Sequence, residues 1–243
     1  MLKSFILVGV VASQLLSAPS KCPTFFANGE TPDFLTKNVE LCFEQFTIGY
    51  STDKKNPLYA AEVLTPESIK AGDAVKRKDE FHQEPLLPKD KQSLLPAYVG
   101  TKYDRGHLVP AADMSTVKAQ YQSFSMSNMT PQYYKNNRGM WKKLEVYTRN
   151  VGAKYKKTYM ISGPIFTKTD SKMKDGTVIP NGYYKIIYVP EIQMVSSFYT
   201  KNLEGQPEDE KALVPVTEIE KMTGYKFPQI PENLKTKPVM EKF

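Results

Sequence analysis

One of the two histidines in the chain, His107, stands among residues that suit proton transfer. It ends the run Tyr-Asp-Arg-Gly-His that begins at Tyr103, so the carboxylate of Asp104 and the guanidinium of Arg105 are its close neighbours. An imidazole near its reference pKa of about 6.5 is substantially neutral at pH 7 and can accept a proton. His107 is therefore the candidate for a chemically active histidine, although a histidine beside charges is in most proteins only a satisfied polar residue.

A second group of polar residues lies on a predicted helix, which we expect to begin near Asn136 or Asn137 and to run to about Arg149. At about 100° per residue, Asn137 falls in the middle of an apolar stripe, with Glu145 and Arg149 at its edge. Taken alone, the segment also fits an ordinary amphipathic core helix with Asn137 as its N-cap. The apolar residues of the stripe are Met140, Trp141 and Leu144.

The spacing of Asn137 and Glu145 limits how they can share a metal ion. Two helical turns separate them by roughly 12 Å along the axis. Metal–oxygen bonds of about 2.0 to 2.6 Å do not bridge that distance unless the start of the helix is distorted. An asparagine ligand together with a glutamate that orients metal-bound water is the better arrangement.

These two groups, with the run Asn128-Met129-Thr130-Pro131-Gln132 between them, resemble the DNA/RNA non-specific endonucleases. This ββα-metal, or His-Me finger, group includes mitochondrial endonuclease G and secreted bacterial nucleases. The resemblance covers roughly residues 57–237, and it implies an α+β fold with a central, mainly antiparallel sheet flanked by helices. The run Tyr133-Tyr134-Lys135 and the region of Cys22 and Cys42 have no role that transfers from the family.

The resemblance implies a magnesium-dependent endonuclease, with manganese as a substitute, that cleaves DNA and RNA with little sequence preference. It implies that His107 is the general base, that Asn137 is the direct protein ligand of the ion, and that Glu145 holds the ion's water shell. It also implies three arginines that face the phosphate or support the site, namely Arg77, Arg105 and Arg149.

The formal charge of +7 on 243 residues suits one domain that attracts a polyanion. Nucleic acid, acidic polysaccharide and an anionic membrane surface all respond to such a charge. Because the lysines are scattered, stable membrane association is the weakest of these. The alternative function is a non-catalytic, secreted protein that binds nucleic acid or heparin. Residue types do not determine the oligomeric state.

The N-terminal residues 1–20 have the order of a secretory signal peptide, namely a basic start, an apolar run and small residues. We therefore expect a secreted or periplasmic protein in which residues 21–243 form a single endonuclease domain. In an oxidising compartment, Cys22 and Cys42 favour a disulfide over a metal site, because no other cysteine or histidine lies near them.

The remaining pattern predicts a mixed α+β domain without internal repeats. Residues 70–96 read as a long polar surface loop and residues 127–132 as a turn. We expect Ser115 to cap a helix over 115–123 and Gly224 to close one over 216–222. The expected strands are at 46–50, 59–63, 103–109, 158–165, 183–189 and 192–199.

Overall fold

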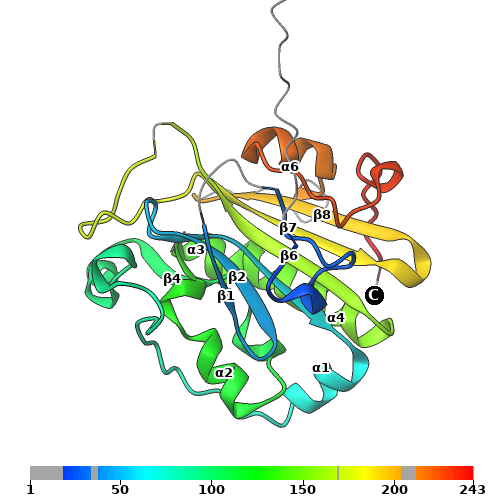
Figure 1. Ribbon diagram of the computed structural model, residues 1–243, viewed down its shortest axis with the longest axis horizontal. Coiled ribbons are helices and arrows are strands. Elements are labelled where there is room, and N and C mark those ends of the chain that lie inside the picture. Colours follow the sequence, from blue (N-terminus) through cyan, green and yellow to red (C-terminus); the bar gives the residue numbers. More distant parts are fainter. Residues whose placement is uncertain (1–18, 34–37, 169, 204–211, 243) are drawn as a thin grey trace, which may run out of the picture.

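The structure is a computed structural model that describes residues 19–33, 38–168, 170–203 and 212–242 (Figure 1). Nearly all of the predicted signal peptide at 1–20 lies outside the described residues. Within the described ranges, no helix combines the length and apolarity needed to cross a membrane.

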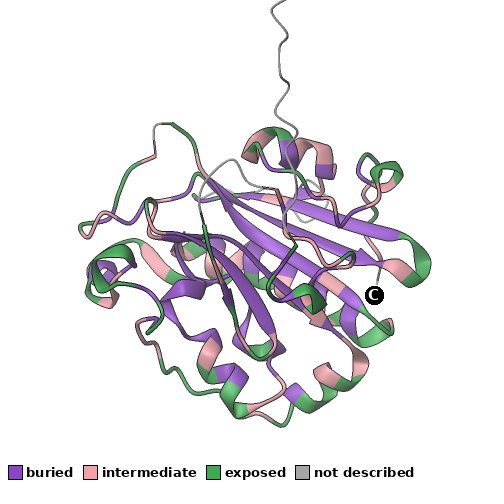
Figure 2. Ribbon diagram, viewed as in Figure 1, coloured by how far each residue is buried: buried purple, intermediate pink, exposed green. Residues whose placement is uncertain are grey.

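A six-stranded antiparallel sheet in the order β1-β2-β3-β6-β7-β8 forms the centre of the molecule (Figure 1). Apart from the edge strand β1, the strands are almost entirely buried, because other elements cover both faces of the sheet (Figure 2). Their bounds are β1 Val39–Cys42, β2 Phe46–Ser51, β3 Asn56–Leu64, β6 Thr158–Ile165, β7 Gly182–Val189 and β8 Met194–Lys201.

The segment between β3 and β6 leaves the sheet and carries every residue that the sequence proposes for the site. It contains a separate two-stranded hairpin and most of the helices. The hairpin strands are β4 (Tyr103–His107) and β5 (Met129–Tyr133), and the helices are α1 (Pro66–Gly72), α2 (Val117–Ser123), α3 (Tyr134–Asn136) and α4 (Lys142–Lys154). Since β3 and β6 pair directly, both ends of this long excursion are fixed to the middle of the sheet.

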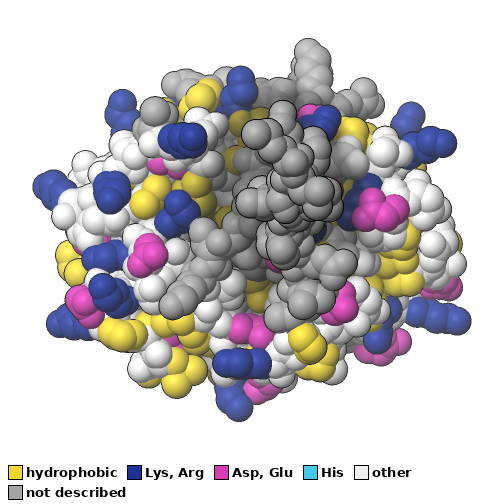
Figure 3. Space-filling model, turned by 45° about the horizontal axis from the view of Figure 1, so that its top comes forward, with side chains coloured by type: hydrophobic (Ala, Val, Ile, Leu, Met, Phe, Trp, Pro, Cys, Tyr) yellow, Lys and Arg dark blue, Asp and Glu magenta, His cyan; other side chains and the backbone are white. Residues whose placement is uncertain are grey.

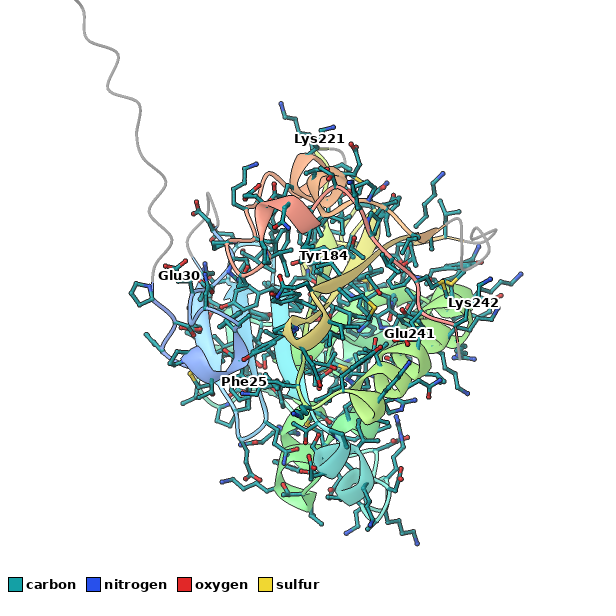
Figure 4. The ribbon with its side chains drawn as sticks, turned by 90° about the vertical axis from the view of Figure 1, so that its right-hand side faces the viewer. Phe25, Glu30, Tyr184, Lys221, Glu241 and Lys242 are labelled. Carbon is teal, nitrogen blue, oxygen red and sulfur yellow. A yellow bond between two sulfur atoms is a disulfide. The ribbon has the colours of Figure 1, made fainter. Side chains whose placement is uncertain are left out.

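Alternate residues of β7 show what covers each face of the sheet. Tyr183 and Ile187 belong to a core shared with α4, whereas Tyr184 and Ile186 belong to a core shared with α6 (Val216–Thr223). Tyr184 lies in the interior, and α6 lies on the outside of the same face (Figure 4). The sheet thus separates the active-site layer from the C-terminal layer.

Three buried hydrogen bonds fasten β5 and the residue that follows β4 to the central sheet. The Ser162 hydroxyl donates to the Leu108 carbonyl at 3.0 Å. The Tyr183 hydroxyl and the Asn202 amide donate to the carbonyl of Pro131 at 2.7 and 2.9 Å. These bonds hold the strand that carries His107 in a defined position above the sheet.

The turn expected at 127–132 is wrong, because Met129–Tyr133 forms strand β5 opposite β4. Asn, Thr and Pro favour turns locally, but proline is tolerated in a two-stranded hairpin where no ladder donor is needed. The carbonyl of Pro131 is then supplied with donors from the sheet, as described above. Tertiary hydrogen bonds therefore override the local preference.

The α+β class and the mainly antiparallel sheet are confirmed, and most element bounds differ from expectation by only a few residues. The long helix begins at Tyr134 and ends at Lys154, and Thr116 rather than Ser115 caps α2. Strand β4 ends at His107, and β8 starts two residues late because Gln193 adopts a left-handed turn with φ 51°. Strand β1 and helix α1 were not predicted.

Both ends of the described chain are fastened to the domain. Cys22 and Cys42 form the expected disulfide, with their Cα atoms 5.9 Å apart, and it joins the N-terminal segment to the end of β1. Near the other end, Glu241 lies beside α4 and accepts from the Tyr155 hydroxyl at 2.8 Å (Figure 4).

Candidate active site

A pocket of about 850 Å³ opens between the β4–β5 hairpin and the helix that follows it. The six residues that the sequence proposes for the site all line this pocket, although they come from a loop, a strand and a helix. They are Arg77, Arg105, His107, Asn137, Glu145 and Arg149.

Trp141 joins the strand half of the site to the helix half. Its indole Nε1–H donates to the backbone carbonyl of His107 at 3.0 Å, and the side chain is fully buried. The indole ring packs against Tyr183, with centroids 5.5 Å apart, and carries the Lys185 ammonium over it at 4.7 Å. This hydrogen bond therefore fixes the position of the helix relative to His107, which lies at the end of β4.

The start of this helix is distorted. Asn137–Trp141 forms a π-helical segment between α3 and α4, so the turn is wider than in an α-helix. The expectation that Asn137 lies in the middle of the apolar stripe is wrong. The wide turn leaves Trp141 buried, while Asn137 is only half-buried and faces the pocket.

Asp104 orients the amide of Asn137. The Asn137 Nδ2 donates to Asp104 Oδ2 at 2.9 Å, and Arg138 donates twice to the same carboxylate, at 2.8 and 2.7 Å. Burial works against ionisation of Asp104, but the hydrogen bonds from Arg138 and Asn137 outweigh it and lower the pKa of Asp104. A carboxylate only accepts, so the amide must turn its nitrogen toward Asp104 and leave its Oδ1 oxygen for another ligand.

His107 is neutral in this environment. Only 9% of the residue is exposed, and its ring lies edge-on to Phe124 at 4.9 Å and 5.8 Å from Phe81. Burial lowers the pKa of His107 to about 3, and the nearby guanidiniums of Arg77 and Arg105 add to this effect. Its Nε2 atom is buried without a hydrogen-bond partner among the described residues.

The glycine before His107 lets the hairpin close. A Cβ atom on Gly106 would lie 2.5 Å from the Cβ of Gln132, whose side chain is fully buried behind β4. Real side chains do not approach so closely, so a larger residue would push β4 away from β5. The glycine of the Asp-Arg-Gly-His run is thus explained by packing rather than by chemistry.

The arginines of the pocket differ in how firmly other side chains hold them. Arg149 donates to the buried carboxylate of Asp113 at 3.0 Å. Arg77 pairs with the exposed Asp79 at 2.7 Å. Arg105 is exposed, lies 4.0 Å over the Phe81 ring, and has no carboxylate partner among the described residues. Its guanidinium is consequently the freest to bind an incoming anion.

Residues 27–233 match the family model described as DNA/RNA non-specific endonuclease. The chain belongs to this family. It is 31% identical to Nuclease C1 of Cunninghamella echinulata var. echinulata, over 82% of this chain and 84% of that protein. It is 27% identical to human mitochondrial endonuclease G, over 76% of this chain and 67% of that protein.

The fold of this endonuclease is also that of a solved relative. The chain in the crystal structure of the EndoG/EndoGI complex aligns with a TM-score of 0.76 and 23% identity, over 86% of this chain and 94% of that one. The chain is therefore an endonuclease of the ββα-metal type that acts on nucleic acid. This membership sets aside the alternative of a non-catalytic binder.

Beneath the pocket of the endonuclease lies a group of buried charged residues. Burial raises the pKa of the partly buried Glu145 to about 7, while Lys185 acts in the opposite direction. Burial likewise raises the pKa of Glu62 well above its ordinary value and lowers that of Lys185. Glu62 is fully buried, and the negative charge of the buried Asp113 carboxylate adds to the rise in its pKa. A neutral Glu62 carboxyl is the form that this site favours.

Arg138 and Lys142 also line the pocket of the endonuclease, although the sequence reasoning gave them no role. Their signal was present, because Arg138, Lys142, Glu145 and Arg149 recur at intervals of four, three and four residues. At about 100° per residue these positions share one face of a helix.

Asn128, from the run between the two groups, and His82, the other histidine of the chain, do not line the pocket. Asn128 is fully buried, and its amide donates to the carbonyls of Val109 and Ser123 at 2.8 and 2.9 Å, which is a structural role. His82 stacks on Tyr121 with ring centroids 4.1 Å apart. It therefore serves as a control for His107.

The indole hydrogen bond predicts the effect of Trp141→Phe. We expect this substitution to lower the free energy of unfolding by about 1 to 3 kcal/mol, because the buried His107 carbonyl loses its donor. It should also lower kcat, since the helix is no longer held to the histidine. Urea denaturation and steady-state cleavage assays measure the two effects. In the control Tyr183→Phe, which removes a different donor to the hairpin, stability should fall with a smaller loss of kcat. An equal loss of kcat in both variants would contradict the proposed link.

The buried imidazole predicts an acid-sensitive fold. The folded pKa of about 3 lies below the reference value of about 6.5, so the unfolded chain binds the proton first as the pH falls. The free energy of unfolding should therefore decrease from about pH 6.5 downward, by up to about 1.4 kcal/mol per pH unit from this group. Urea denaturation gives the free energy of unfolding at about pH 7 and about pH 5. The decrease between the two pH values should be smaller in His107→Leu than in wild type or His82→Ala. The same acid loss in all three proteins would refute this assignment.

Proposed function

We propose that this endonuclease hydrolyses phosphodiester bonds of DNA and RNA with magnesium, or with manganese in its place. The observation that carries the proposal is that a buried, neutral His107 and the outward amide oxygen of Asn137 line one pocket together with several arginines. A proton acceptor, a hard oxygen ligand and fixed cations are the groups that phosphodiester hydrolysis requires.

His107 is the general base of the proposed mechanism. As a neutral imidazole, it can take a proton from the water that attacks phosphorus. A pKa of about 3 is low for this task, because an efficient base has a pKa near the working pH. Phosphates bound beside Arg77 and Arg105 would offset the guanidinium charges that disfavour imidazolium. The substrate would thus raise the proton affinity of the base when it is needed.

The residues present fit a magnesium ion held by few protein ligands. The Asn137 oxygen is directed away from Asp104, and Glu145 provides a partly buried carboxylate on the same helix. No group of three or more His, Cys, Asp or Glu residues suited to a metal occurs among the described residues, and magnesium commonly keeps waters and substrate oxygens as its other ligands. When bound, the ion would stabilise the negative charge that develops on the phosphate and the leaving oxygen.

The cations of the pocket would bind and orient the phosphate backbone. Arg105 has no carboxylate partner in the described part of the chain, so we assign it the primary contact. Arg149 is oriented by Asp113 and would act from a fixed position, whereas Arg77 is held only by an exposed pair. Guanidinium groups match phosphate oxygens in bidentate geometry, which favours arginine over lysine here.

Backbone recognition supports cleavage with little sequence preference and with strong salt dependence. On the face shown in Figure 3, Lys and Arg side chains are spread over the surface among Asp and Glu, not gathered in one basic stripe. The selective attraction of nucleic acid would then come from the pocket rather than from a general coating of charge.

We also propose that residues 21–243 act as one exported domain after removal of a signal peptide at 1–20. The Cys22–Cys42 disulfide supports this, because structural disulfides persist in oxidising compartments such as the periplasm or the exterior.

His107→Ala should lower kcat on plasmid DNA and on RNA by about 10² to 10⁴-fold, the usual contribution of a general base, while nucleic-acid binding persists. His82→Ala, which changes the other histidine, should retain most of the activity. Digestion by each protein is followed on gels with magnesium, with manganese and with a chelator. The wild-type protein should cleave only in the reactions that contain metal. Cleavage by His107→Ala near the wild-type rate would rule out the base, and cleavage in chelator would rule out the metal.

Asn137→Ala should raise the magnesium concentration needed for half-maximal activity and lower kcat, because the ion loses its direct protein ligand. Asn150→Ala alters an exposed asparagine of the same helix outside the pocket and should leave the metal titration unchanged. Circular dichroism would establish that both variants fold. If Asn137→Ala kept the wild-type titration curve, the ligand assignment would be wrong.

A further inference from the structure

The pocket is lined by two chemically different sets of residues. The charged set comes from the π segment and α4 and from residues 77–79 and 104–105, and the proposed hydrolysis uses it. A second set comes from residues 95–103 and is apolar or aromatic, and the hydrolysis of a phosphate gives it no function. Its members are Leu95, Tyr98, Val99 and Tyr103.

This apolar lining is exposed at Val99, partly exposed at Leu95 and Tyr103, and supported from below by the buried Tyr98. Val99 is 79% exposed, directly after a 3-10 helix over Leu95–Tyr98 that buries Tyr98 against a small core. The Thr101 hydroxyl donates to the Tyr98 carbonyl at 2.9 Å and accepts from the Tyr103 backbone N–H at 3.2 Å. A fixed turn therefore presents a large apolar side chain to solvent at the pocket, where burying it would be favourable.

Tyr103 extends this surface along the end of the hairpin. Its ring meets Tyr133 edge-on with centroids 6.4 Å apart, and Tyr133 lies 4.9 Å from Tyr134. The guanidinium of Arg138, which itself lines the pocket, lies 5.6 Å over the Tyr134 ring. All three tyrosines are partly exposed, so aromatic surface leads from the pocket to one of its cations.

A ligand that suits both sets must carry anionic groups and flat apolar faces within one short unit. A nucleotide has this character, but in a regular duplex its base is already paired and stacked on its neighbours. Only an unpaired base can offer a free face, and stacking such a base on an aromatic side chain contributes about 1 to 3 kcal/mol. The Tyr133-Tyr134-Lys135 run, which had no role from the sequence, then acquires one.

We propose that Val99 and Tyr103, supported by Tyr133 and Tyr134, form a stacking subsite for an unpaired nucleobase in the same pocket as the scissile phosphate. The endonuclease would consequently prefer single-stranded or locally unpaired DNA and RNA to regular duplex. This inference rests on the proposed function for its substrate, but not on the identity of the base or the metal.

The test combines two changes, namely removal of the Tyr103 ring from the protein and removal of the bases from the oligonucleotide. Fluorescence anisotropy in chelator, which excludes cleavage, gives the Kd for a short thymidine oligonucleotide and for a strand of equal length whose sugars carry no base. Wild type should bind the normal strand more tightly. In Tyr103→Leu this advantage should shrink about ten-fold, because the stacking surface is removed while the phosphates are unchanged. Val99→Ser should reduce it in the same direction.

Tyr121→Leu and Val117→Ser are the matched controls, since both residues are exposed on α2 and neither lines the pocket. They should preserve the wild-type advantage of the normal strand. Thermal unfolding reports whether each variant is folded, and the ratio of kcat/KM for single strand to that for duplex should fall in Tyr103→Leu but not in Tyr121→Leu.

Equal weakening of both strands by Tyr103→Leu would overturn the subsite and leave the ring a structural role. No advantage of the normal strand in wild type would overturn it as well. Either result together with metal-dependent cleavage leaves the proposed function intact. Base-dependent binding without cleavage would instead overturn the proposed function and retain the subsite.

Discussion

The hydrogen bond from the buried Trp141 indole to the His107 carbonyl is the contact on which the geometry of the site depends. The proposed base ends a strand and the proposed metal ligand lies near the start of a helix, so the covalent chain alone does not set their separation. The buried indole–carbonyl pair does so together with the contacts of Asp104 on β4 to Asn137 and Arg138. The indole bond is the costly one to break, because the carbonyl has no access to water. The π segment makes this contact compatible with function, since its wide turn buries Trp141 while Asn137 remains at the pocket.

Burial shifts the pKa values of His107 and Glu145, which both line the pocket, in opposite directions. It keeps His107 neutral, and it raises the pKa of Glu145 to about 7. Neither group is held in its charged form by the protein alone. Phosphates beside the arginines would favour the protonated histidine, and a divalent cation beside Glu145 would favour its carboxylate. Under the proposed mechanism, each ligand would shift its neighbouring residue toward the charge that the reaction needs.

Several features of the site were predictable from local spacing, and others were not. The grouping of His107 with Asn137 and Glu145 came from the resemblance to the endonuclease family, and the strands with clear alternation were found within a few residues. Strand β5 was missed, because the donors that satisfy Pro131 come from Tyr183 and Asn202, far along the chain. The role of Arg138 was missed although its helical spacing marked it, because its partner Asp104 lies on the hairpin.

The sequence by itself determined the chemical inventory of this endonuclease, which is one histidine directly after a glycine, one asparagine near the start of a helix, and arginines at recurring intervals. It also determined the α+β class, since hydrophobic periodicity is a local property of the chain. Only the tertiary structure decided that burial keeps His107 neutral well below its reference pKa, that Asn137 turns its oxygen outward, and that an aromatic surface shares the pocket. Each of these depends on desolvation or on contacts between distant segments, which residue order does not encode locally.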